Sequence, residues 1–130
     1  MTDTWQTIAH LVSRLEDHSA LPREQRILLQ LLKIQEEAGE VAEAVIGATG
    51  QNPRKGHSHD WDDVEAEICD VIVTGMVALM RMNPDAEAVF TQHMTRIADR
   101  DLNNEQASSA ASGAAELAPV ADNTTGEKQK

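Results

Sequence analysis

The sequence predicts an all-α domain built like a four-helix bundle. Its 130 residues suffice for one domain with a hydrophobic core. Residues that favour strands are scarce, with one Phe, two Trp and no Tyr, whereas Ala, Leu, Glu and Gln are plentiful. Apolar residues also recur at spacings of three and four over long stretches, which is the pattern of helices that bury one face.

The first half of the chain predicts two helices. Residues 4–18 form the first, in which Trp5 and Ile8 begin a helical spacing of apolar side chains. Pro22 suits the first turn of the second helix, which we expect over residues 22–47. An apolar stripe with alternating steps of four and three follows that helix: Ile27, Leu31, Ile34, Ala38, Val41 and Val45.

A loop is predicted between Gly47 and His59, where glycine and proline recur. It carries Arg54 and Lys55 in an otherwise acidic protein. Two interpretations stay open. The loop is either a solvated connection or a mobile lid whose cations contact phosphate oxygens.

A third helix is predicted from an N-cap at Asp60 to about residue 82. Between Ile68 and Met80 its only polar side chains are Asp70 and Thr74. A helix that is apolar nearly all round is buried, in the domain core or against another subunit. Asp70 is therefore expected where an unpaired charge is costly, and Cys69 is expected to be a small buried residue.

The last predicted helix opens at Asn83-Pro84 and ends near residue 100. The composition then changes to Ala, Ser, Gly, Asn and Thr, which favours a disordered tail. The expected organisation is one helical domain over residues 1–102, followed by a disordered tail over residues 103–130.

Two acidic clusters lie on the second and third predicted helices. Glu36, Glu37 and Glu40 fall within two helical turns, and Glu67 and Asp70 stand three residues apart. Residues three or four apart share one helix face, and consecutive helices joined by a loop tend to pack as antiparallel neighbours. Glu37, Glu40, Glu67 and Asp70 would then converge. Such a group of carboxylates suits Mg²⁺, which prefers oxygen ligands.

A solvated helix face is the simpler interpretation of a glutamate-rich helix. Two features favour a metal site. The second cluster stands in a nearly continuous apolar segment, where a solvated face is not expected. The two clusters also lie on successive helices.

The pair of motifs, EExxE and then ExxD after 26 intervening residues, resembles the MazG-like nucleoside triphosphate pyrophosphohydrolases of the all-α NTP pyrophosphatase superfamily. The resemblance covers roughly residues 22–100. It implies an enzyme that hydrolyses a nucleoside triphosphate to the monophosphate and pyrophosphate, with a house-cleaning role in the nucleotide pool. It also implies Mg²⁺, with Mn²⁺ as a substitute, and a homodimer or homotetramer.

By motif position, the resemblance makes Glu37, Glu40, Glu67 and Asp70 the metal ligands. Glu36 would be an additional ligand or the group that orients or deprotonates the attacking water, and a carboxylate beside a metal-bound water can take its proton. Glu36 and Glu37 are thus the candidate catalytic residues. Five further residues are candidates for substrate binding: Lys33, Arg54, Lys55, Trp61 and Arg96.

The net charge of −11 argues against nucleic acid and anionic membranes as partners. No apolar run is long enough to span a bilayer. Because Cys69 is the only cysteine and the first residues do not resemble a signal peptide, we expect a cytoplasmic protein. The long apolar stripes predict an oligomer.

Two alternatives to this function stay open. The same site could hydrolyse another nucleotide-like phosphoester or a diphosphate. The protein could also be a non-catalytic helical interaction module that retains an acidic cluster.

Overall fold

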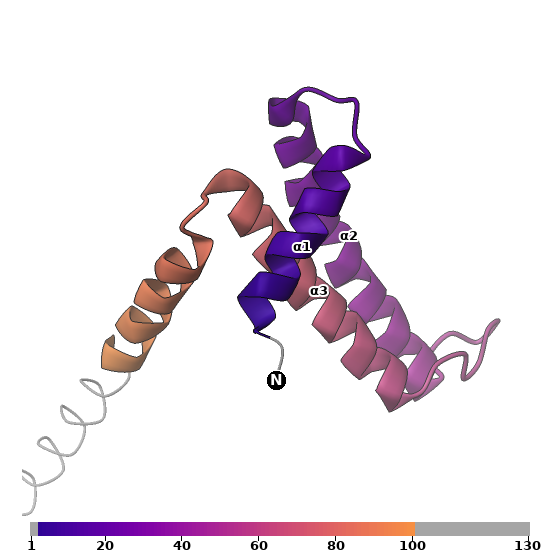
Figure 1. Cartoon of the computed structure of the whole chain (residues 1–130). Helices are drawn as coiled ribbons and strands as arrows, with labels where there is room; N and C mark the ends of the chain where they lie inside the picture. The colour runs from indigo at the N-terminus through magenta and orange to yellow at the C-terminus, as the bar shows by residue number, and fades with distance from the viewer. Residues whose placement is uncertain (1–2, 101–130) are drawn as a thin grey trace, which may run out of the picture. The chain divides into compact units, whose positions relative to one another are not determined.

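The computed structural model describes residues 3–100, and these residues form helices and no strand (Figure 1). The long helices are α1 (Thr4–Asp17), α2 (Arg23–Thr49) and α3 (Trp61–Met82). A further helix covers residues 86–100. The predicted all-α fold is confirmed for this part of the chain, whereas the predicted tail over 103–130 lies outside the described residues.

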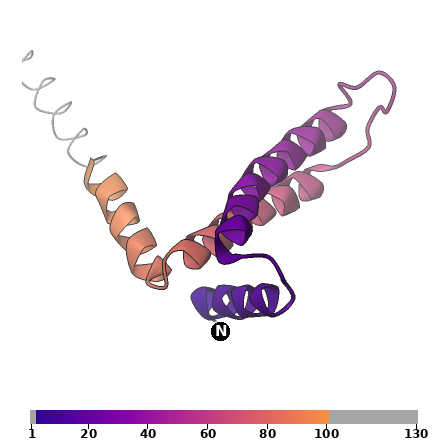
Figure 2. The ribbon, with the colours of Figure 1, turned by 90° about the horizontal axis from the view of Figure 1, so that it is seen from above.

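The chain divides into two compact units, one ending at Phe90 and one beginning at Thr91. In the first unit, α2 and α3 run antiparallel and side by side, as Figures 1 and 2 show, and this pair makes the most extensive contact between helices. Helix α1 also contacts α3. The pairing of α2 with α3 is the arrangement that the sequence predicted for its two acidic helices.

Side-chain caps fix the starts of two helices. Asp3 accepts a hydrogen bond from the backbone N–H of Trp5 at 3.0 Å and caps α1. At α3, Asp60 accepts from the N–H of Asp63, and Asp63 accepts in return from the N–H of Asp60. This reciprocal capping box satisfies two backbone donors, and it confirms the predicted cap at Asp60.

Helix α2 ends at Thr49, two residues beyond its predicted end. Its terminator is Gly50, which has a φ of 65° in the left-handed region that glycine adopts readily. Gly47 is instead a buried residue inside the helix. With two glycines three residues apart, the sequence alone did not show which one ends the helix.

The loop after α2 folds back over the end of that helix. The N–H of Ser58 donates to the carbonyl of Gly47 at 3.2 Å, and Nδ1 of His57 donates to the carbonyl of Ala48 at 3.1 Å. A Cβ at position 47 would lie only 2.6 Å from Ser58 Oγ. Glycine is therefore needed at position 47 for close packing of the loop.

The helix over residues 86–100 begins two residues later than predicted. Asn83 Oδ1 accepts from the N–H of Asp85 at 2.9 Å, and this turn precedes the first helical hydrogen bond, from Val89 to Asp85. The prediction of Pro84 as the first helical residue was therefore wrong, because an asparagine-centred turn intervenes.

An ion-pair network joins the three long helices. Glu16 on α1 contacts Arg81 of α3 (Nε to Oε1, 3.1 Å) and Arg26 of α2 (Nη2 to Oε2, 2.7 Å). Arg81 also donates to Gln30 Oε1 at 3.0 Å. Through this network Glu16 fixes the end of α1 against the α2–α3 pair.

The hydrophobic core of the described residues is small, and its buried apolar members are Ile8, Ala44, Val64, Val77, Ala78 and Ala86. Large apolar side chains remain exposed on α2 and α3, including Leu32 (67% exposed) on α2 and Ile72 (55%) on α3. Within the described residues no helix combines the length and the apolar character needed to cross a bilayer.

Helix α3 is buried on one face only in the single chain. Ile68, Ile72 and Val73 are exposed, so the nearly all-apolar segment is not enclosed by the chain itself. Cys69 is exposed too, so its predicted burial was wrong for the single chain. The reason is geometric: α2 covers one side of α3, and Cys69 lies about 200° around the helix axis from Glu67, which faces α2.

Candidate metal centre

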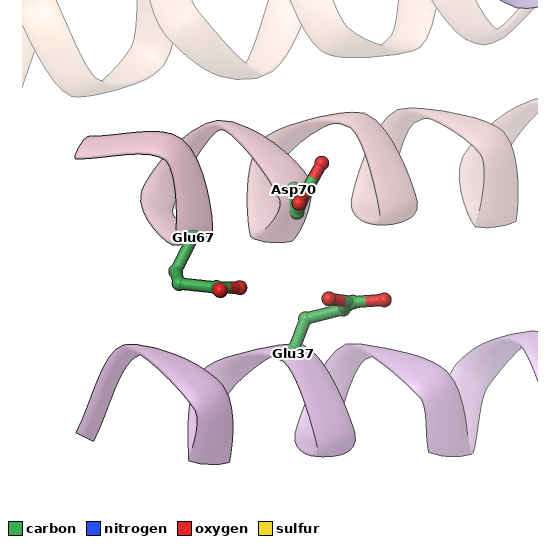
Figure 3. A group of neighbouring side chains, drawn as sticks. All are labelled: Glu37, Glu67 and Asp70. Atoms are coloured by element: carbon green, nitrogen blue, oxygen red, sulfur yellow. The ribbon is translucent and has the colours of Figure 1, made fainter. Parts of the chain in front are cut away.

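Three carboxylates from the paired helices meet in one small volume (Figure 3). Glu37 comes from α2, and Glu67 and Asp70 come from α3. Each offers one oxygen, and the three oxygens all lie within 4.8 Å of one another. The spacing of three residues places Glu67 and Asp70 on one face of α3, and the antiparallel contact with α2 brings Glu37 opposite them.

The three members of this acidic triad differ in burial. Glu37 is buried, with 7% of its surface exposed, whereas Glu67 is half-buried and Asp70 is exposed. The predicted burial of Asp70 was therefore wrong for the single chain. Asp70 lies at the side of the α2–α3 contact, where the triad opens to solvent.

Glu40 does not belong to the group of three close carboxylates among the described residues. It is nevertheless near enough for their charges to affect it. The negative charge of Glu37 is the main cause that raises the pKa of Glu40 above its ordinary value, with burial and the charge of Glu67 adding to it. Glu40 thus borders the triad as a carboxyl group that resists ionisation.

Lys33 neutralises one edge of the acidic cluster. Its ammonium lies 2.8 Å from Glu37 Oε1 and 2.9 Å from Glu36 Oε2. The hydrogen bond from Lys33 is the main reason that the pKa of Glu37 lies below its ordinary value, and the same contacts raise the pKa of Lys33. Glu37 is thereby kept ionised although it is buried.

The donor set of the triad fits a hard divalent cation. Mg²⁺ takes carboxylate oxygens at about 2.1 Å and retains several water ligands, so three carboxylates with one solvent-open side suit it. Clusters of exposed acidic groups are common on proteins without any ion. Burial of Glu37 distinguishes this one, because a buried carboxylate beside two others is costly unless a cation compensates it, and Lys33 supplies one such cation.

The predicted substrate-binding residues are scattered in their placement. Lys33 is beside the triad, whereas Lys55 is paired with Glu43 (Nζ to Oε1, 3.0 Å). Arg54 and Trp61 are exposed, in the loop and at the first residue of α3. Arg96, which donates to Gln92 Oε1 at 3.0 Å, belongs to the second unit.

A hollow of about 260 Å³ between α2 and the loop was not predicted. Its lining includes Ile46 and Gly39 of α2, together with Lys55 and Asn52 of the loop. Ile46 is nine residues from Glu37, which places it about 180° around the α2 axis. The hollow therefore lies on the side of α2 away from the triad.

The pairing of Lys33 with the acidic cluster was readable in the sequence. Lys33 precedes Glu36 by three residues and Glu37 by four, and such pairs are neighbours on a helix surface. The contact between Lys55 and Glu43 was not readable, because it depends on how the loop folds back.

Comparison of this chain with models of protein families, with curated proteins and with solved structures found no match in any of the three.

Proposed function

We propose that this protein is a Mg²⁺-dependent nucleoside triphosphate pyrophosphohydrolase of the MazG-like type, acting in the cytoplasm. The observation that supports the proposal is the acidic triad: three carboxylates from two antiparallel helices, with one oxygen each within 4.8 Å. The motif pair in the sequence assigns the reaction class, by its resemblance to the family. The expected products are a nucleoside monophosphate and pyrophosphate.

In this proposal, Glu37, Glu67 and Asp70 hold the metal, and Glu40 completes the set from the border of the triad. A bound Mg²⁺ would neutralise phosphate charge and lower the pKa of a coordinated water. Glu36 is exposed and shares the ion-pair partner Lys33 with Glu37. In this proposal its carboxylate orients the attacking water or accepts its proton. Mn²⁺, which also accepts carboxylate oxygens, would be able to replace Mg²⁺.

The working form in this proposal is a homodimer or homotetramer. The support is the exposed apolar surface of α2 and α3, which includes Leu28, Leu32 and Ile72, each more than half exposed. Apolar patches of this kind mark interfaces. A second copy that packed against these faces would also enlarge the small core of the single chain.

The decisive experiment measures pyrophosphate release from a panel of canonical and modified nucleoside triphosphates with Mg²⁺. Wild type is compared with Glu67→Gln, Asp70→Asn and the control Glu65→Gln, which changes an exposed carboxylate of α3 outside the triad. We expect release by wild type and by the control, and its loss in both triad variants. Orthophosphate in place of pyrophosphate would indicate the alternative phosphohydrolase chemistry.

A second candidate function is a non-catalytic helical interaction module. The specific observation that favours it is the same exposed apolar surface on α2 and α3. The two candidates differ in their response to metal. If the protein does not bind Mg²⁺ at millimolar concentration, whether or not nucleotide is present, the module is favoured and the enzyme proposal fails.

A further inference from the structure

The ammonium of Lys33 contacts Glu37, the buried member of the acidic triad. Its contacts with Glu37 Oε1 (2.8 Å) and Glu36 Oε2 (2.9 Å) are both short. The two partners of the closer contact differ in exposure, since the Glu37 side chain is 10% exposed and the Lys33 side chain 49%. A half-exposed cation thus holds a buried carboxylate that also belongs to the candidate metal site.

We infer that Lys33 is the resident counter-ion of the triad, which a divalent cation displaces and which then binds the phosphate chain of the substrate. This inference rests on the proposed function, because it takes the triad as the metal site. It assigns Lys33 two successive partners: Glu37 before metal binding, and a phosphate oxygen after it.

Displacement follows from the shared carboxylate. A divalent cation among the three oxygens would lie within a few ångströms of the ammonium on Glu37, and two cations at such a separation repel. The contact that Lys33 gives up is a partly exposed ion pair, and such pairs contribute little free energy. Lys33 can also move, because its charge is carried on a flexible four-carbon chain.

The released ammonium remains at the mouth of the site. It carries three hydrogen-bond donors and no acceptor, and charge-assisted bonds to phosphate are among the stronger ones. Lys55, a cation of the loop, has a different ion-pair partner. It is paired with Glu43, which lies outside the group of three close carboxylates.

The test compares Lys33→Met with Arg14→Met in the full-length protein. Arg14 is an exposed cation in the last turn of α1, outside the proposed site. Each change removes one positive charge, and only Lys33→Met also removes the two ion pairs with Glu36 and Glu37. Mn²⁺ binding is measured by electron paramagnetic resonance without nucleotide, at low ionic strength. Inorganic tripolyphosphate binding is then measured by calorimetry at saturating Mg²⁺. Lys33→Gln serves as a second variant should the methionine disturb folding.

We expect Lys33→Met to bind Mn²⁺ about two- to five-fold more tightly, which corresponds to an exposed ion pair, and tripolyphosphate about ten-fold more weakly, which corresponds to a lost charged hydrogen bond. Arg14→Met should change neither affinity in this way. Unchanged or weaker Mn²⁺ binding by Lys33→Met, or unchanged tripolyphosphate binding, would overturn the inference alone. Absence of Mn²⁺ binding by wild type would overturn the proposed function as well.

Discussion

Arg81, near the end of α3, contacts Glu16, near the end of α1, with 3.1 Å between Nε and Oε1. The Arg81 side chain is only 10% exposed, and Glu16 pairs at the same time with Arg26. One carboxylate therefore compensates two guanidinium groups from two different helices. This relationship makes Glu16 the residue through which α1 is electrostatically attached to the α2–α3 pair.

Glu16→Gln is expected to lower the free energy of unfolding by about 2 kcal/mol, because it leaves the largely buried Arg81 without its counter-ion. Asp17→Asn, an exposed neighbour on the same helix, should change stability by less than about 0.5 kcal/mol. Urea unfolding followed by circular dichroism measures both. Equal midpoints for the two variants would show that the network does not stabilise the fold.

Gly47→Ala and Gly39→Ala should change stability in opposite directions. A Cβ at position 47 would meet Ser58 Oγ at 2.6 Å, whereas nothing lies within 4 Å of a Cβ at position 39. Alanine is a better helix former than glycine by about 1 kcal/mol, so Gly39→Ala should stabilise α2. Gly47→Ala should destabilise the protein, because the loop has to move away from the helix. Thermal unfolding measures both shifts, and stabilisation by both variants would contradict the observed packing.

Glu40→Gln should raise the melting temperature of the metal-free protein at pH 7. The ordinary pKa of this group is 4.5, and the charges of Glu37 and Glu67 raise it in the folded state. The folded state therefore binds the proton more tightly than the unfolded chain does. As the pH rises above 4.5, ionisation of this carboxyl lowers the free energy of unfolding. Glutamine cannot ionise, so Glu40→Gln avoids this destabilisation.

The pH series supplies the control for this prediction. Well below pH 4.5, Glu40 is protonated in both states, so wild type and Glu40→Gln should melt alike there. The melting curves are measured with a chelator present. A gap between the two proteins that persists unchanged at low pH would contradict the electrostatic origin.

Divalent metal should stabilise the folded protein through the triad. A ligand that binds only the folded state adds about 2.7 kcal/mol at 100 times its dissociation constant. We expect Mg²⁺ or Mn²⁺ to raise the melting temperature of wild type, and a chelator to reverse the rise. Glu37→Gln should abolish it, because Glu37 is the member that α2 contributes. Glu24→Gln, an exposed glutamate in the first turn of α2, should retain it.

The sequence by itself determined the helices and the face on which most acidic residues lie. Residues three or four apart share a face because of the helical period alone, so the placement of Glu67 and Asp70 on one face was predictable. The cap at Asp60 was predictable as well, because capping depends on the local chain. The pairing of α2 with α3 followed from their being consecutive along the chain.

Tertiary structure alone decided which residues are enclosed and which groups meet across helices. The exposure of Asp70 and Cys69 depends on how much of α3 is covered by α2, and no local sequence pattern predicts the extent of that cover. Gly47 was ambiguous because its burial arises from the returning loop. The attachment of Glu16 to Arg81, 65 positions further along the chain, likewise exists only after the helices have packed. Helical period acts along one helix, whereas burial and ion pairing between helices depend on distances that only packing sets.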